Sequence, residues 1–173
     1  MMMIQENLHE ARAFVKIKHE IPYLDPIRGW AKLLVSEEEI GNLITNGGRV
    51  AVHTYIYGTT AQRTSGGLSG TGLNYIALSN DGTSPADGDT SLTGELSADG
   101  LGRAQGTVTL PTGAETITTV EKEFTYTGTT QAVQKTALFD DSSGGKMAHE
   151  ILFTQRTLNN GDTLTLTFSI TLS

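Results

Sequence analysis

Apolar and polar residues alternate strictly along the C-terminal residues 163–173. Because the side chains of a strand point alternately to its two faces, this pattern predicts a strand with one buried face. Threonines and a serine make up the other face. A one-residue slip of the strand would turn every apolar side chain to water, so its register is expected to be fixed. The predicted buried face consists of Leu164, Leu166, Phe168, Ile170 and Leu172.

Shorter apolar segments, separated by Gly-, Asn- and Asp-rich turns, precede this strand from residue 73 onward. Residues of these types at this spacing predict a mainly β fold, namely an antiparallel β-sandwich or jelly-roll-like domain. The sequence Asn159-Asn160-Gly161-Asp162 predicts a hairpin turn between the last two strands, because Asn and Gly accept positive φ. The other predicted strands span residues 73–78, 104–110, 116–126, 133–139 and 147–153.

The first third of the chain has a different pattern. Apolar residues alternate with charged ones over residues 15–21, which favours a short strand. Ser36, followed by three glutamates, matches a helix capping box, and Asn46-Gly47-Gly48 is a helix stop signal, so a short helix is predicted between them. The segment from Arg49 to Tyr57 is compatible with either a strand or a second helix.

These differences divide the chain into three regions. Residues 1–57 are predicted to form an N-terminal arm and helical region, residues 58–72 a Gly/Ser/Thr-rich connector, and residues 73–173 the β-sandwich domain. Removing residues 1–35 is therefore expected to leave the sandwich folded. Apolar residues of the arm are candidate contacts for a partner, since aromatic side chains often anchor interfaces. These partner-binding candidates are Ile4, Leu8, Phe14, Tyr23 and Trp30.

Composition narrows the function. The 173 residues carry a net charge of -7, which argues against binding nucleic acid. The chain has no cysteine, which excludes disulfides and cysteine-ligated metals. The sequence has no apolar stretch long enough for a membrane helix and no apolar run typical of a signal peptide, so no membrane association is expected.

Candidate chemistry is sparse. Asp81, Asp87 and Asp89 lie on one loop and leave calcium binding open, although their spacing does not match an EF-hand. The four histidines are too far apart in sequence to suggest zinc, and no nucleophile motif is present. The sequence thus predicts no catalytic, cofactor-binding or metal-binding residue, and a protein that is not an enzyme.

The order of short motifs in residues 45–173 resembles a module that recurs in the virion proteins of tailed bacteriophages. That family is known from decoration, collar and tail-fibre proteins and has no known catalytic residues. The similar segment before the module is helical in the family, which would make the stretch from Arg49 to Tyr57 helical. The motifs are residues 45–49 (TNGGR), 73–79 (LNYIALS), 89–92 (DTSL), 100–104 (GLGRA), 135–140 (KTALFD), 143–145 (SGG) and 160–164 (NGDTL).

The resemblance implies a non-enzymatic structural protein of the virion, assembled in the host cytoplasm. The small acidic domain with an arm favours a capsid decoration or cement protein, whose partners are the major capsid protein or other virion proteins. A tail, collar or short-fibre component is the alternative. A homo-oligomer is expected from virion symmetry, with a trimer as one candidate. A second alternative is a carbohydrate-binding β-sandwich, with Tyr55, Tyr57 and Tyr126 as possible sugar contacts.

Overall fold

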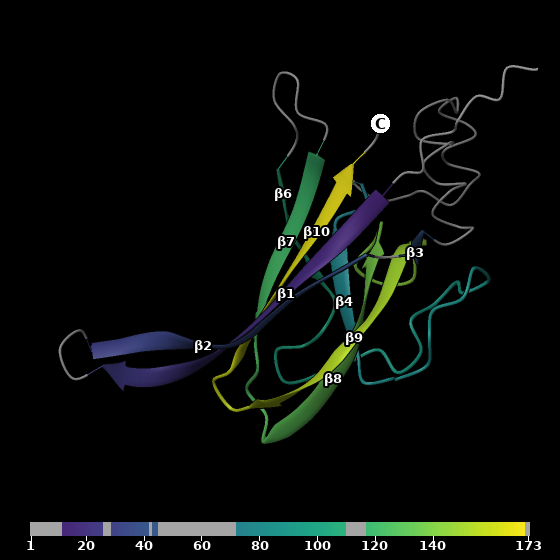
Figure 1. Cartoon of the computed structure of the whole chain (residues 1–173). Helices are drawn as coiled ribbons and strands as arrows, with labels where there is room; N and C mark the ends of the chain where they lie inside the picture. Colours follow the sequence, from purple (N-terminus) through teal and green to yellow (C-terminus); the bar gives the residue numbers. More distant parts are fainter. Residues whose placement is uncertain (1–11, 26–28, 42, 45–71, 110–116, 172–173) are drawn as a thin grey trace, which may run out of the picture.

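The protein is a sandwich of two antiparallel β-sheets in the computed structural model, which describes residues 12–25, 29–41, 43–44, 72–109 and 117–171 (Figure 1). This confirms the predicted mainly β, antiparallel sandwich. Sheet A contains, in spatial order, β2 (Gly29–Gly41), β1 (Arg12–Asp25), β10 (Thr163–Thr171), β7 (Ile117–Thr125) and β6 (Thr107–Thr109). Sheet B contains β3 (Leu43–Ile44), β9 (Met147–Asn159), β8 (Thr130–Phe139), β4 (Tyr75–Ser79) and β5 (Ala104–Gln105).

The main core lies between the two sheets. Leu164, Leu166 and Phe168 of β10 are fully buried and Ile170 is partly buried, which confirms these four residues of the predicted apolar face. Leu172, the fifth, lies outside the described residues. The four described residues pack in one cluster with buried residues of sheet B such as Ile76 and Leu138. The register of β10 is fixed from both sides, because it pairs with β1 and with β7 along its whole length.

A smaller cluster lies on the opposite face of sheet B. Ala77 alternates with the core residues of β4, and Ala137 lies directly opposite it on β8. Phe139 and Met147 join these alanines, and Leu92, from the segment that follows β4, packs against them. The segment between β4 and β5 therefore covers the outer face of sheet B.

The first strand lies inside sheet A. β1 lies between β2 and β10, with Arg12 opposite Thr171 and Glu20 opposite Thr163. Residues predicted to form an N-terminal arm and helical region thus supply two strands of the sandwich. Truncation of residues 1–35 would remove the strand beside β10, so we now expect it to disrupt the sandwich rather than to leave it folded.

The predicted helix at Ser36 is wrong, because this segment belongs to β2. Its glutamates point alternately to the two faces of the strand and find basic partners on both. Glu37 Oε1 lies 2.6 Å from Lys16 Nζ of β1, and Glu38 Oε2 lies 2.6 Å from Arg156 Nη2 of β9. Strand pairing and these ion pairs outweigh the local capping signal. The parts of the chain that the structure describes contain no helix, so the predicted helical extension is not observed there.

The predicted C-terminal hairpin is also wrong. β9 belongs to sheet B and β10 to sheet A, so the turn between them joins the two sheets as an arch. The Asn-Gly turn itself is present, with Gly161 at φ +90°. Backbone hydrogen bonds tie it to Tyr126, which accepts from Gly161 N (2.8 Å) and donates to Asp162 O (2.9 Å). These bonds fix the turn to the end of β7 in sheet A.

A second transition between the sheets divides the strand predicted over residues 104–110. β5 pairs with β4 in sheet B, and β6 pairs with β7 in sheet A. Gly106 joins the two strands, and its N–H donates to Asn74 O (2.7 Å). A single residue thus moves the chain from one layer to the other.

Several predictions concern residues outside the described ranges. The segment from Arg49 to Tyr57, residues 58–71 of the connector, and Ile4 and Leu8 all fall there. None of the described residues forms a helix long and apolar enough to cross a membrane.

Candidate functional site

A two-stranded hairpin extends beyond the end of sheet A. β10 begins at Thr163, opposite Glu20, whereas β1 and β2 continue to pair with each other as far as Asp25 and Gly29. We call the part beyond β10, Ile21–Asp25 together with Gly29–Val35, the projecting hairpin; it extends to the left in Figure 1. Pro22 lies in this part. Proline lacks a backbone N–H, which is tolerated here because β10 does not pair with this part of β1.

Large apolar side chains of the projecting hairpin are exposed to water. Trp30 is 78% exposed and Leu24 63%, and three consecutive residues of β2 are each about half exposed. Of the seven large apolar side chains that are exposed in the described part of the chain, six belong to this hairpin. A cluster of this kind marks an interaction surface. The six are Tyr23, Leu24, Trp30, Leu33, Leu34 and Val35.

The apolar residues occupy both faces of the hairpin. Leu24 lies opposite Trp30, and directly opposed residues in an antiparallel pair share a face. Tyr23 and its neighbours point to the other face, where Ile21 lies opposite Leu33. A two-stranded ribbon is only marginally stable alone in water, and within the described part of the chain these apolar side chains remain exposed. The arrangement is therefore suited to insertion against a partner rather than to free exposure.

The base of the projecting hairpin is anchored to the sandwich. His19 Nε2 lies 3.3 Å from Asp162 Oδ2 in a buried contact, next to the point where β1 leaves β10. At the same level β2 carries one extra residue, because Glu20 pairs with Leu34 whereas His19 pairs with Ser36. This bulge changes the course of the strand. The hairpin is thus fixed at its base, and its apolar part lies beyond the anchor.

The predicted partner-binding residues are separated by the structure. Tyr23 and Trp30 lie on the projecting hairpin, on opposite faces. Phe14 lies farther back in β1, opposite Ser169 of β10 and Gly41 of β2. The residues predicted from the sequence do not include Leu24 or the three apolar residues Leu33, Leu34 and Val35. Their signal was present, because three consecutive apolar residues break the alternation of a strand with one buried face.

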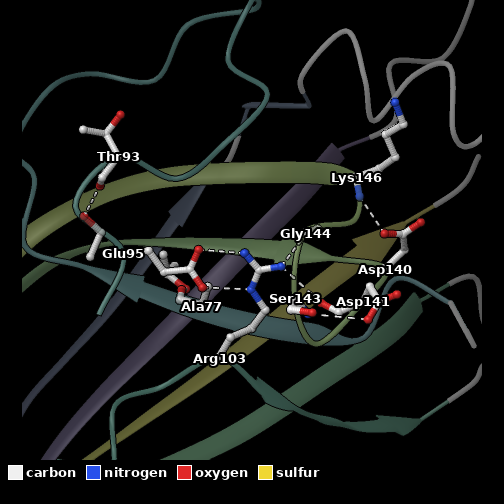
Figure 2. Close-up of polar contacts among 11 residues, drawn as sticks. Ala77, Thr93, Glu95, Arg103, Asp140, Asp141, Ser143, Gly144 and Lys146 are labelled. Carbon is white, nitrogen blue, oxygen red and sulfur yellow. Dashed lines mark hydrogen bonds and ion pairs between the residues drawn. The ribbon is translucent and has the colours of Figure 1, made fainter. Parts of the chain in front are cut away.

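A cluster of polar contacts lies around Arg103, on the outer side of sheet B (Figure 2). Its Nε and Nη2 donate to the two carboxylate oxygens of Glu95, at 2.9 and 2.6 Å. Its Nη1 donates to the carbonyls of Asp141 (3.2 Å) and Gly144 (2.7 Å). The guanidinium carbon also lies 3.5 Å from the centre of the Phe139 ring. Arg103 thus holds the segment after β4 against the turn between β8 and β9. We call this set of contacts the Arg103 clamp.

Several motifs that carry the phage resemblance meet at this clamp. Phe139 belongs to the KTALFD motif, Gly144 to the SGG motif and Arg103 to the GLGRA motif. The next residue of the first motif, Asp140, is fully buried and accepts a hydrogen bond from Lys146 N at 2.6 Å (Figure 2). These residues stabilise turns and the cover of sheet B, so their role in this structure is architectural.

Lys135 of β8 is a buried cation between two carboxylates. Its Nζ lies 2.5 Å from Asp81 Oδ2 and 3.3 Å from Glu150 Oε1. The hydrogen bond from Lys135 lowers the pKa of Asp81 below its ordinary value. Burial raises the pKa of Glu150, and a hydrogen bond with Asp89 adds to this effect. The ion pairs therefore attach the loop after β4 to sheet B.

The aspartates considered for calcium serve this loop in the structure. Asp81 binds Lys135, and Asp89 Oδ2 accepts a hydrogen bond from Ala86 N at 2.7 Å. Within the described ranges, no group of three or more His, Cys, Asp or Glu side chains is arranged to hold a metal ion. Among the described residues, the projecting hairpin is thus the feature best suited to bind a partner.

Comparisons with protein-family models, with curated proteins and with solved structures found no match to this chain.

Proposed function

We propose that the protein is a non-enzymatic structural component of a tailed-bacteriophage virion, a capsid decoration or cement protein that attaches through its projecting hairpin. The observation that carries the proposal is the exposure of Trp30 and Leu24 on a hairpin that extends beyond its own sheet. Trp is enriched among residues that dominate binding energy at interfaces. The resemblance of residues 45–173 to phage virion modules supplies the class of partner.

The form of the hairpin suits a cement function. A protein that stabilises an assembled shell needs a rigid body and an element that reaches a neighbouring subunit. Here the clamped sandwich is the body, and the hairpin, anchored at His19, is the element that reaches out. Apolar residues on both of its faces favour a site between two subunits of the major capsid protein, where both faces would be covered.

Attachment is tested with the double variant Leu24→Ser/Trp30→Ser. Both side chains are exposed, so the variant is expected to fold and melt like the wild type. Loss of an interfacial aromatic anchor of this kind costs about 2 kcal/mol or more, which weakens binding at least about 30-fold. The measurement is co-sedimentation with purified phage particles that lack the protein.

The matched control is Val108→Ser, which removes an exposed apolar side chain from β6 at the opposite edge of sheet A. This variant is expected to bind particles like the wild type. Equal binding by the Leu24→Ser/Trp30→Ser variant and the wild type would refute attachment through the hairpin.

Copy number distinguishes the two positions considered within the virion. A decoration protein follows the symmetry of the capsid and occurs in many copies, whereas a tail, collar or short-fibre component occurs in few. Quantitative mass spectrometry of purified particles, with the major capsid protein as internal standard, gives this ratio directly.

A further inference from the structure

We infer that two copies of this chain pair through β2, so that sheet A continues across a two-fold axis into sheet A of the second copy. β2 is a long strand at the edge of its sheet, and β1 is the strand it pairs with among the described residues. Edge strands of this kind present unpaired backbone N–H and C=O groups to other chains. The inference goes beyond the proposed attachment, because it uses the edge of β2 and leaves both faces of the hairpin for the capsid.

The bulge in β2 places a base and an acid on the same face. Lys32 lies opposite Pro22, and Glu37 lies opposite Lys18. Pro22 and Lys18 are four residues apart on β1 and therefore share a face. Lys32 and Glu37 share that face too, although they are five residues apart, because the extra residue lies between them.

This geometry makes β2 complementary to itself. In an antiparallel pairing centred between Leu34 and Val35, Lys32 of each copy lies opposite Glu37 of the other, on the same face. Leu33 then lies opposite Ser36, and these two also share a face, the one that Ile21 and His19 occupy. Two Lys–Glu pairs thus flank an apolar centre made by Leu34 and Val35. Opposite charges at directly opposed positions favour pairing in this register.

The pairing also supports the projecting hairpin. Its β2 half extends beyond β10, and among the described strands it pairs with β1 alone. In the dimer this half lies along the Val35–Glu39 half of the other copy, inside that copy's sheet.

Sedimentation equilibrium tests the inference. The wild type is expected to show about twice the chain mass of 18.5 kDa. Lys32→Glu and Glu37→Lys each place like charges opposite one another twice per dimer, so each is expected to weaken dimerisation at least tenfold. The exchange Lys32→Glu/Glu37→Lys restores opposite charges between copies and is expected to restore dimerisation.

The exchange separates pairing between copies from effects within one chain. Lys32 also binds Glu123, and Glu37 binds Lys16, and neither of these contacts is restored in the double variant. The control Lys146→Glu changes an exposed charge in the turn between β8 and β9 and is expected to leave the mass unchanged. A monomeric or trimeric wild type, or a double variant as weak as the single ones, would overturn the pairing. Particle co-sedimentation of the Leu24→Ser/Trp30→Ser variant reports separately on the proposed function.

Discussion

At the scale of single residues, His149 shows how burial sets a pH limit on the fold. Its ring lies in the core, 6.3 Å from the ring of Phe168. Burial disfavours the charged imidazolium and lowers the pKa of His149 from 6.5 to about 4. The unfolded chain therefore takes up a proton at a higher pH than the folded protein does.

The sign of this difference predicts acid destabilisation. Above pH 6.5 the imidazole is neutral in both states and His149 contributes no pH dependence. As the pH falls from 6.5 to 4, its contribution lowers the free energy of unfolding by up to about 1.4 kcal/mol per pH unit, or about 3 kcal/mol in total. Urea unfolding at a series of pH values measures this effect.

His149→Gln is the comparison, because glutamine does not titrate. The variant is expected to be less stable than the wild type at pH 7, and the gap is expected to narrow as the pH falls to 4. Parallel pH profiles for the two proteins would show that His149 is not the buried neutral group described here.

At the scale of elements, the crossing between β5 and β6 depends on a close approach at Gly106. A Cβ at this position would lie 2.8 Å from Val120 Cγ1 and 2.9 Å from Glu121 O. Gly106→Ala is therefore expected to lower the free energy of unfolding by about 1–3 kcal/mol, the usual cost of overpacking. Gly88→Ala is the control, since a Cβ there meets nothing within 4 Å. Thermal melting that shows equal stability for both variants would contradict the tight crossing.

The sequence predicts where the strands of this protein lie better than it predicts which strands pair with each other. The alternation along residues 163–171 is local information, and β10 follows it. The arch after β9 could not be predicted, because Asn160-Gly161 specifies a turn but not the sheet that the next strand joins. The helix at Ser36 was predicted wrongly because the glutamates that fit a cap also fit ion pairs with Lys16 and Arg156, which lie far away in sequence.

The candidate site was predicted in part for a similar reason. Tyr23 and Trp30 were identified as aromatic residues suited to an interface, and the structure places both on the projecting hairpin. Leu24 and Leu33 look like ordinary core residues in the sequence. They are exposed because β10 begins only at Thr163, opposite Glu20, whereas β1 extends beyond Glu20. The sequence of β1 alone does not show where its neighbouring strand begins.

At the scale of the whole molecule, the fold separates a stabilised body from an element that is suited to contacts. The Arg103 clamp and the Lys135 ion pairs fasten the cover of sheet B, on the layer that does not carry the hairpin. The exposed apolar surface is concentrated at one end of sheet A. This division is what a protein needs if it is to keep its own shape while it joins neighbouring subunits.

Attachment to the virion through the projecting hairpin is the proposal on which the function of this protein rests. An electron cryomicroscopy map of the purified phage particle at side-chain resolution tests it most directly. We expect the two-sheet body in many copies on the capsid surface, with Leu24 and Trp30 in contact with a neighbouring virion protein. A particle without this body, or one in which the hairpin of every copy lies in open solvent, would contradict it.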